Sequence, residues 1–234
     1  MRTLTHTLLV IGLLIPASFA KNSKIGKDLD TAKEDTVDVI VQYKVQPTGA
    51  HQDKVARKGG KSKLRLNAAR ADVYSIKASE LDDLANDPDV SYISPDRVVQ
   101  ATDVYTNEAS NAATAQSYGF DGTGIGVAVI DSGVSLPPDL VKRVVYSESF
   151  VSPKSDEVYG HGTHVAGIIA GIGKDSSKKY IGVAPGANII ALRVLDDNGK
   201  GADSNVIAAI DRAIALRTKY NIRVINLSLG RAVK

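Results

Sequence analysis

Gly-Val-Ala-Val-Ile-Asp-Ser-Gly, residues 126–133, is an apolar run that ends abruptly in an acid and a turn. Its apolar residues Val127–Ile130 lie between a glycine and the pair Ser132-Gly133, a pattern typical of a short buried strand. Asp131 stands where that strand ends. In an open α/β sheet, this rim is where ligands and catalytic groups usually lie. We therefore expect a functional site at Asp131.

Apolar runs on the C-terminal side of this stretch alternate with helical patterns. Residues 188–195 and 224–229 predict two more buried strands, and a further strand is expected over 141–146. Residues 160–171 are rich in small side chains, as in a helix packed tightly in a core. An apolar stripe at helical spacing predicts another helix over 203–220. This alternation is typical of an α/β domain with a parallel sheet covered by helices.

A separate small unit is predicted over residues 37–100. Apolar and polar residues alternate over 37–45, which indicates a half-buried strand, and a basic, partly helical stretch follows over 51–70. A strand is expected over 72–78 and a last strand over 90–93 and 98–99, with a short helix between the two strands. The order strand, helix, strand, helix, strand predicts an α+β domain that is marginally stable alone. Because its sequence contains no group of residues suited to catalysis, its simplest role is that of a small binding module.

The first twenty residues have the features of a secretory signal. Arg2 gives a positive start, residues 8–15 are apolar, and Ser18 and Ala20 are small residues that suit cleavage after Ala20. A membrane anchor or a buried helix is the alternative, but the run is too short to span a bilayer of about 30 Å. We expect residues 1–20 to be removed and the protein to be secreted, without a stable membrane anchor.

Two polar segments are expected to be linkers, residues 21–36 before the small unit and 101–117 after it. The large domain then spans residues 118–234. Glycines at alternate positions within 119–126 raise the alternative of a nucleotide-binding α/β domain. A phosphate loop follows a strand and opens a helix, whereas these glycines precede the strand, so they are better interpreted as a surface turn.

The composition excludes several classes of site. The net charge is +3, there is no cysteine or tryptophan, and 5% of the residues are aromatic. So small a charge argues against binding to nucleic acid, and the scarcity of aromatic residues argues against a base-stacking surface. Without cysteine there is no disulfide framework, thiolate metal site or cysteine nucleophile.

His161 is the second candidate for chemistry. It stands between Gly160 and Gly162, so no bulky neighbour in the sequence blocks close approach to the imidazole. An acid at a strand end and a histidine at a helix start are two members of a nucleophilic triad, in which the acid orients the histidine that deprotonates a serine. These residues alone leave a structural role open. A metal site formed by His161 and His164 is a further alternative, but it has no third ligand nearby.

The motifs around both residues resemble those of subtilisin-like serine proteases, the subtilases. Val-Ile-Asp-Ser-Gly at 129–133 is similar to the aspartate motif of the family, and His-Gly-Thr-His-Val-Ala-Gly at 161–167 is similar to its histidine motif. The resemblance continues through 182–185 and 224–230. It implies a subtilisin-like catalytic domain with a parallel sheet, preceded by a propeptide, the small α+β unit, that inhibits the protease and assists its folding.

The resemblance also implies roles for individual residues. Asp131 would orient His161, and His161 would be the general base. Lys200-Gly201 would lie on a strand that pairs with the substrate backbone, and Ser228-Leu229-Gly230 would form one wall of the primary specificity pocket. The substrates would be polypeptides.

No cofactor is required for this chemistry. Asp139 matches a calcium-ligand position of many subtilases, but the lysine-rich loop 173–180 departs from the usual calcium loop. Structural calcium, possible in the full-length family, is therefore not supported by this sequence.

The nucleophile of the family lies in a Gly-Thr-Ser motif, which these 234 residues do not contain. The oxyanion-hole asparagine is absent as well. We therefore expect a catalytic domain truncated before the nucleophile and a chain that does not hydrolyse peptides. The alternative is a non-catalytic product in which the small unit inhibits or chaperones a complete protease. If complete, the enzyme would be a monomer inhibited by its own propeptide.

Overall fold

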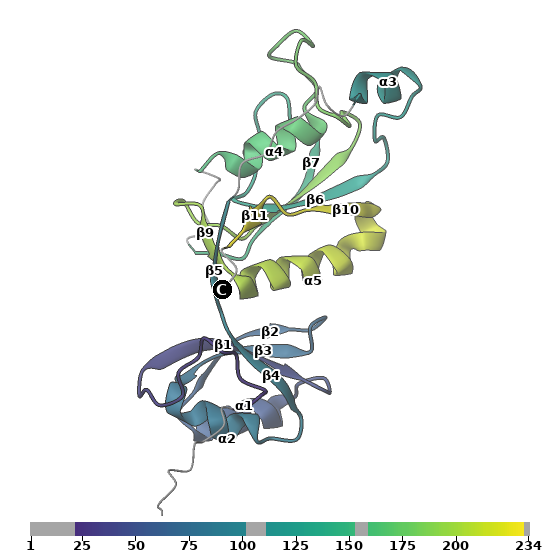
Figure 1. The fold of residues 1–234 in the computed structure, drawn as a ribbon. Coiled ribbons are helices and arrows are strands. Elements are labelled where there is room, and N and C mark those ends of the chain that lie inside the picture. The colour runs from purple at the N-terminus through teal and green to yellow at the C-terminus, as the bar shows by residue number, and fades with distance from the viewer. Residues whose placement is uncertain (1–21, 102–110, 153–158, 232–234) are drawn as a thin grey trace, which may run out of the picture.

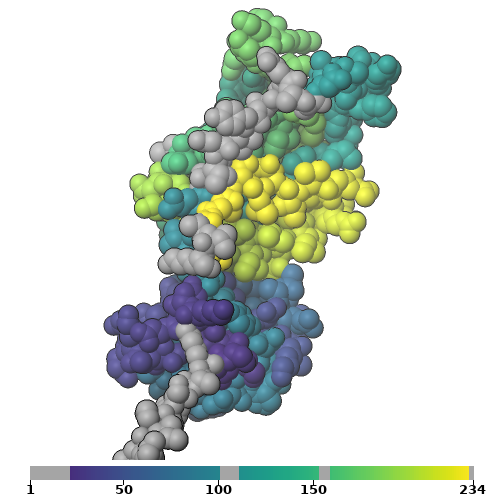
Figure 2. Space-filling model, in the orientation of Figure 1, coloured from purple at the N-terminus to yellow at the C-terminus, as the bar shows by residue number. Residues whose placement is uncertain are grey.

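The computed structural model describes residues 22–101, 111–152 and 159–231. They form two units in broad contact, a smaller one that ends at Pro95 and a larger one from residue 111 onward (Figure 1, Figure 2). The signal expected over 1–20 lies outside the described residues. Within the described ranges, no helix is both long enough and apolar enough to cross a membrane.

The smaller unit is a four-stranded antiparallel sheet with helices on one face (Figure 1). In the spatial order β2-β3-β1-β4, its strands are β2 (Lys61–Leu66), β3 (Ala71–Lys77), β1 (Thr36–Tyr43) and β4 (Val90–Pro95). Its helical segments are α1 (Gly49–Arg57), a single 3-10 turn (Ala78–Glu80) and α2 (Leu81–Ala85). The apolar core between helices and sheet includes Val39, Val55 and Leu81, all fully buried. This is the α+β arrangement that the sequence predicts.

Two features of this unit differ from the expectations. The basic stretch that follows α1 forms the strand β2, whose first residues are exposed while Leu66 at its end is buried. The range 21–36, expected to be a linker, contributes Ile25 and Leu29 to the core, with exposures of 3% and 4%. Ile25 also forms a bridge with Ile93 of β4. Isolated apolar residues in a polar segment produce no periodic pattern, so the sequence does not reveal their burial.

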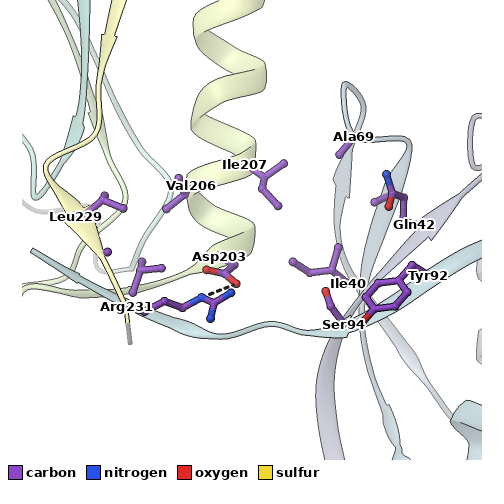
Figure 3. A pocket seen from close by; sticks show the side chains of 13 residues that line it. Ile40, Gln42, Ala69, Tyr92, Ser94, Asp203, Val206, Ile207, Leu229 and Arg231 are labelled. Carbon is purple, nitrogen blue, oxygen red and sulfur yellow. Dashed lines mark ion pairs between the residues drawn. The ribbon is translucent and has the colours of Figure 1, made fainter. Parts of the chain in front are cut away.

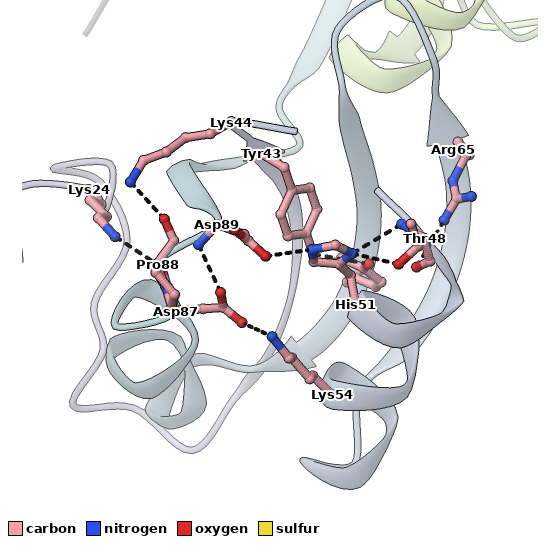
Figure 4. Close-up of polar contacts among 11 residues, drawn as sticks. Lys24, Tyr43, Lys44, Thr48, His51, Lys54, Arg65, Asp87, Pro88 and Asp89 are labelled. Atoms are coloured by element: carbon pink, nitrogen blue, oxygen red, sulfur yellow. Dashed lines mark hydrogen bonds and ion pairs between the residues drawn. The ribbon is translucent and has the colours of Figure 1, made fainter. Parts of the chain in front are cut away.

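A polar cluster fixes the start of α1 (Figure 4). The backbone amide of Thr48 donates to Nδ1 of His51 at 3.0 Å, and Nε2 of this buried histidine lies 3.3 Å from Asp89 Oδ2. Because Nδ1 accepts a hydrogen bond, the proton of the neutral ring sits on Nε2, facing the carboxylate. Tyr43 packs edge-on against the same ring, at 4.6 Å between centroids. The cluster thus joins the start of α1 to the segment that precedes β4.

The larger unit is a parallel sheet between two helices (Figure 1). Its strands, in the spatial order β10-β6-β8-β7, are β10 (Ile222–Asn226), β6 (Gly126–Asp131), β8 (Asn188–Arg193) and β7 (Val144–Ser149). The helices are α4 (His161–Ala170) on one face and α5 (Asp203–Tyr220) on the other, and the short α3 (Ala112–Ser117) precedes them. All six residues of β6 are buried, with Val129 in the core under α4 and Ile130 in the core under α5. The predicted α/β class with a parallel sheet is confirmed.

The strand β10 differs from the expectation of burial over 224–229. On β10 Val224 is 50% exposed and Ile225 is 39% exposed, and Leu227, which follows the strand, is 46% exposed. The reason is its place in the sheet, because β10 is an outer strand that pairs with β6 on one side. The C-terminal segment accordingly lies on the molecular surface, in yellow in Figure 2.

A third, antiparallel sheet links the two units. Residues 98–99 were expected to belong to the last strand of the small unit, but β5 (Val98–Ala101) leaves that unit. It lies instead between β9 (Lys200–Ala202) and β11 (Leu229–Gly230) of the larger unit. Asp96 and Arg97 alone connect β4 to β5.

The open face of the small sheet packs on α5. Ile40 and Val73 of the sheet belong to one apolar cluster with Ile207 and Ala208 of the helix. The amide of Ala68 also donates to the carboxylate of Asp211, at 3.0 Å. Helix α5 is therefore shared between the core of the larger unit and the contact with the smaller one.

Candidate active site

Asp131 and His161 meet at the carboxyl end of β6. Nδ1 of His161, the first residue of α4, lies 2.7 Å from Oδ1 of Asp131, which also accepts the Ser132 amide at 2.7 Å. The side chain of Asp131 is fully buried, and that of His161 is 13% exposed. The pair therefore has the geometry in which a carboxylate holds Nδ1–H and leaves Nε2 as the basic nitrogen.

Burial raises the pKa of the Asp131 carboxyl, although the hydrogen bonds from His161 and from the Ser132 amide act in the opposite direction. Its Oδ2 is buried without a hydrogen-bond partner among the described residues. A desolvated carboxylate of this kind is stabilised most by a nearby positive charge. Proton uptake by His161 would supply that charge, so the pair is suited to forming an imidazolium.

Glycine is required where the two motifs touch. A Cβ atom at Gly162 would lie 2.1 Å from the carbonyl oxygen of Gly133. The Gly162 amide donates to the Ser132 hydroxyl at 2.9 Å, which ties the start of α4 to the end of β6. Gly160, which precedes His161, has φ of 90°, a conformation that favours glycine. The close approach of the two motifs thus requires glycine at position 162.

Four of the residues predicted to bind substrate lie on the two strands that flank β5, and the space between these strands, the β9–β11 groove, is filled by β5. Lys200 and Gly201 lie on β9, and Leu229 and Gly230 lie on β11, with β5 paired between them. The fifth, Ser228, is buried directly before β11, and its hydroxyl accepts a hydrogen bond from Asn226 at 2.9 Å.

Gly201 has no room for a larger residue, because a Cβ atom there would lie 2.1 Å from the Val194 carbonyl oxygen. Within β5, Val99 is 4% exposed and Val98 is 59% exposed. One side of the inserted strand therefore faces the larger unit, and the other faces solvent.

A cavity of about 430 Å³ lies beside the groove, between the two units (Figure 3). Its lining includes Tyr92 from the smaller unit, Val206 and Leu229 from the larger unit, and Val99 from the inserted strand. At one end Arg231 Nε lies 3.5 Å from Asp203 Oδ2. Burial raises the pKa of Asp203 although Arg231 opposes the shift.

The two residues considered above as possible metal ligands, Asp139 and His164, lie in different surroundings. Asp139 Oδ1 accepts hydrogen bonds from the backbone amides of Lys174 and Asp175. His164 is exposed on α4. Among the residues that the structure describes, no group of three or more His, Asp or Glu side chains has an arrangement that could hold a metal ion.

Tyr159 is a neighbour of His161 that the sequence reasoning missed. Its ring centroid lies 6.5 Å from that of the imidazole, at an interplanar angle of 47°. Gly160 and Gly162 flank His161 in the sequence, and the nearby aromatic ring comes from Tyr159, one residue beyond Gly160. The glycine that separates Tyr159 from His161 turns the chain, and nothing in the polar stretch before it indicates where the ring lies.

Comparison with known proteins agrees with this geometry. The model of the subtilase family matches residues 122–234. A subtilisin-like protease of Coccidioides posadasii is 32% identical over 83% of this chain and 52% of its own length. Subtilisin E of Bacillus subtilis is 36% identical over 76% of this chain and 47% of its own length. The chain thus spans about half the length of these relatives.

Among solved structures, fervidolysin from Fervidobacterium pennivorans, described as a keratinolytic enzyme related to subtilisin, has a TM-score of 0.66 and 26% identity. The match covers 89% of this chain and 38% of fervidolysin. By sequence, by fold and by the motifs that bring Asp131 and His161 together, the chain belongs to the subtilase family of serine proteases.

Proposed function

We propose that this chain is part of a secreted serine endopeptidase precursor and supplies the acid and the base of its catalytic triad. The proposal rests on the 2.7 Å distance between Nδ1 of His161 and Oδ1 of Asp131, whose buried side chain stands at the end of a parallel strand. Asp131 orients the imidazole. His161 takes the proton of a serine hydroxyl as that oxygen attacks the peptide carbonyl, and then gives the proton to the leaving amine.

Polypeptides are the proposed substrates. The groove between β9 and β11 already holds an extended segment of this chain as a middle strand. A substrate would bind in the same way, with backbone hydrogen bonds giving affinity and side-chain pockets giving selectivity. Lys200, Gly201, Leu229 and Gly230 would supply the pairing edges, and Ser228 would stand in the pocket wall.

We further propose that the smaller unit is a propeptide that inhibits the monomeric enzyme within the same molecule. In support, β5 fills the proposed substrate groove and the small sheet covers α5. Release would follow cleavage between Val99 and Ala109, after secretion directed by residues 1–20.

We propose that the 234 residues do not hydrolyse peptides on their own, because no Gly-Thr-Ser motif is among them. In subtilisin itself, removing the serine costs on the order of 10⁶ in turnover. The purified chain should release no fluorophore from peptide substrates. Release that a serine-directed organophosphonate blocks would contradict this proposal.

The catalytic proposal is tested by sequencing the coding DNA beyond codon 234 and by assaying the protein that it encodes. A continuing frame with Asn and Gly-Thr-Ser motifs would allow expression of the longer protein. In it, Asp131→Asn should lower kcat by about 10⁴, because the wrong imidazole tautomer is held. His161→Ala should lower it at least as much. His164→Ala, at an exposed position on the same helix, is the matched control and should retain activity. Full activity of the His161 variant would exclude the proposed mechanism.

A further inference from the structure

We infer that Arg193 is a positioning residue, which fixes the β9 edge of the β9–β11 groove relative to Asp131. The inference rests on the proposed peptidase function, because β9 is the edge with which a substrate backbone is proposed to pair. Arg193 belongs to none of the motifs that identify the family, and the proposed mechanism does not use it.

Arg193 is a buried cation at the end of an otherwise apolar stretch. The four residues before it in β8, Ile189–Leu192, are fully buried, and Arg193 itself is 4% exposed. A core position of this kind normally holds an apolar residue, because burial of a charge is costly unless the charge is paired and hydrogen-bonded. The strand register places Arg193 beside Asp131 of β6. A charge at this place is therefore expected to do more than fill the core.

The guanidinium of Arg193 connects two points of the chain that follows β8. Its Nε donates to the carbonyl oxygen of Leu195 at 3.1 Å, and its Nη2 lies 2.5 Å from Asp197 Oδ1. The side chain of Asp197 is 41% exposed, whereas that of Arg193 is 5% exposed. A guanidinium presents several donors in a fixed plane, so it can hold both acceptors at once. It thus joins the end of β8 to the turn over residues 196–199.

The first of these points also holds the acid of the proposed triad. The carbonyl oxygen of Asp131 accepts the amide of Val194 at 2.7 Å and the amide of Leu195 at 3.2 Å. Leu195 therefore donates to Asp131 through its amide and accepts from Arg193 through its carbonyl oxygen. The backbone of the acid and the guanidinium are joined through this one residue.

The second point lies in the turn that leads into β9. The amide of Asp196 donates to the Lys200 carbonyl oxygen at 2.7 Å, and Asp196 Oδ1 accepts the Lys200 amide at 2.9 Å. The Gly199 amide donates to the carbonyl oxygen of Asp196 at 3.0 Å. Gly201 lies so close to β8 that a Cβ atom there would be 2.1 Å from the Val194 carbonyl oxygen. A shift of the turn would therefore move Lys200 and Gly201, the proposed pairing edge.

A substrate has to pair with β9 and to present its peptide carbonyl to the triad at the same time. The distance between the β9 edge and Asp131 therefore has to be fixed. Misplacement of a bound substrate by about 1 Å can cost about 100-fold in rate. Arg193 fixes this distance because it holds the turn at Asp197 and holds Leu195, which contacts Asp131. It acts through the turn and through β9, so its role is positioning.

Hydrogen exchange in the 234-residue chain tests the inference without requiring catalysis. Arg193→Met keeps an apolar stem but removes the guanidinium. It should speed exchange of the amides of β9 and β5 by about tenfold or more, while the central amides of β6 and β8 exchange as in the parent. The NMR resonance of the Nδ1 proton of His161 should stay in place, because the contact with Asp131 is kept. Arg212→Met, which removes an arginine from an exposed ion pair with Glu148, is the matched control and should leave β5 and β9 unchanged.

Asp197→Ala removes the same ion pair from its exposed side and leaves the core filled. It should speed exchange in β9 by about threefold. In the Arg193→Met background it should add little, because the two side chains act through one contact. If Arg193→Met unfolds, Asp197→Ala decides the test.

Two results would overturn the inference. One is unchanged exchange in β9, and the other is equal acceleration in β6, β8 and β9, which would give Arg193 a general structural role. Either result would leave the peptidase proposal standing, because no hydrolysis is measured. That proposal fails separately, through full activity of the His161 variant of the longer protein.

Discussion

The carboxylate of Asp96 accepts two hydrogen bonds from Ser204, one from the backbone amide at 2.9 Å and one from the hydroxyl at 2.6 Å. Ser204 is the second residue of α5, whose own N-cap, Ala202, offers no side-chain cap. Amides at a helix start lack intrahelical partners and carry a partial positive charge. An acid from the connection between β4 and β5 thus caps a helix of the other unit.

Replacing Asp96 by alanine should therefore loosen the contact between the units. Loss of a helix cap costs about 1 kcal/mol, which corresponds to a fall in Tm of roughly 2–4 °C for a chain of this size. Differential scanning calorimetry of the intact chain measures the change. Asp82→Ala, at an exposed acid of α2, is the control. Equal changes in the two variants would show that the cap contributes nothing.

Two glycine-to-alanine changes in α4 should have opposite effects. Gly162→Ala places a Cβ atom 2.1 Å from the Gly133 carbonyl oxygen, so the helix start must shift away from Asp131. Gly167→Ala, in the same helix, meets nothing within 4 Å. It should raise stability by about 0.5–1 kcal/mol, because alanine favours the helix. Chemical denaturation measures both. A stable Gly162→Ala variant with an unchanged imidazole environment by NMR would contradict the structure.

Tyr43 and Tyr74 should make the smaller unit sensitive to alkaline pH. Burial raises the pKa of Tyr43 to about 12, and burial also raises that of Tyr74, whose hydroxyl donates to the buried Asp72 at 2.9 Å. In the unfolded chain both ionise near the ordinary value of about 10.

The contribution of these two tyrosines to the free energy of unfolding is therefore full below pH 10. It falls as the pH rises toward 12, by on the order of 2 kcal/mol for Tyr43. Ultraviolet titration of the nine tyrosines should show three that ionise late, because burial raises the pKa of Tyr146 as well. Tyr43→Phe should flatten the alkaline decline. Simultaneous ionisation of all nine in the folded chain would count against this assignment.

The loop 173–180 should be independent of calcium. Asp139 already accepts the amides of Lys174 and Asp175, so its carboxylate holds the loop directly. Addition of EDTA should leave Tm unchanged. Asp139→Ala should lower stability by about 0.5–1.5 kcal/mol, because the two exposed amides exchange the carboxylate for water. Asp175→Ala, at an exposed position without that role, is the matched control. A rise in Tm with millimolar calcium would refute this prediction.

The outer strand β10 should make the 234-residue chain prone to aggregation. On this strand Val224 and Ile225 are 50% and 39% exposed, and Leu227, just after it, is 46% exposed. Exposed apolar edges template pairing between chains. Ile225→Lys should reduce light scattering on heating while the Tm stays the same. Thr218→Lys, which adds the same charge on an exposed position of α5, should not. Equal scattering by both variants would place the aggregation site elsewhere.

Much of the larger unit could be predicted because its signals are local. Long apolar runs identified β6 and β8, helical spacing identified α5, and the motifs drew attention to Asp131 and His161. These features depend on residues close together in the chain. The parallel sheet followed from the alternation of such elements.

The features that sequence reasoning missed depend on distant contacts. The insertion of β5 between β9 and β11 joins segments about 100 and 130 residues apart, which no local pattern encodes. The exposure of β10 follows from its place in the strand order. Tyr159 lies near His161 across the turn at Gly160, and the lysine and arginine residues of β2 obscured the pattern of its two leucines.

The shortness of the connection formed by Asp96 and Arg97 has a consequence for how the groove is occupied. A strand tethered so closely to a docked unit is held near its site at an effective concentration on the order of millimolar or more. Weak pairing is then enough to keep the groove filled. Once the chain is cut beyond β5, the smaller unit becomes a separate molecule, and the fraction of grooves that it occupies falls with dilution. An interaction that is permanent within one chain thus becomes reversible between two chains.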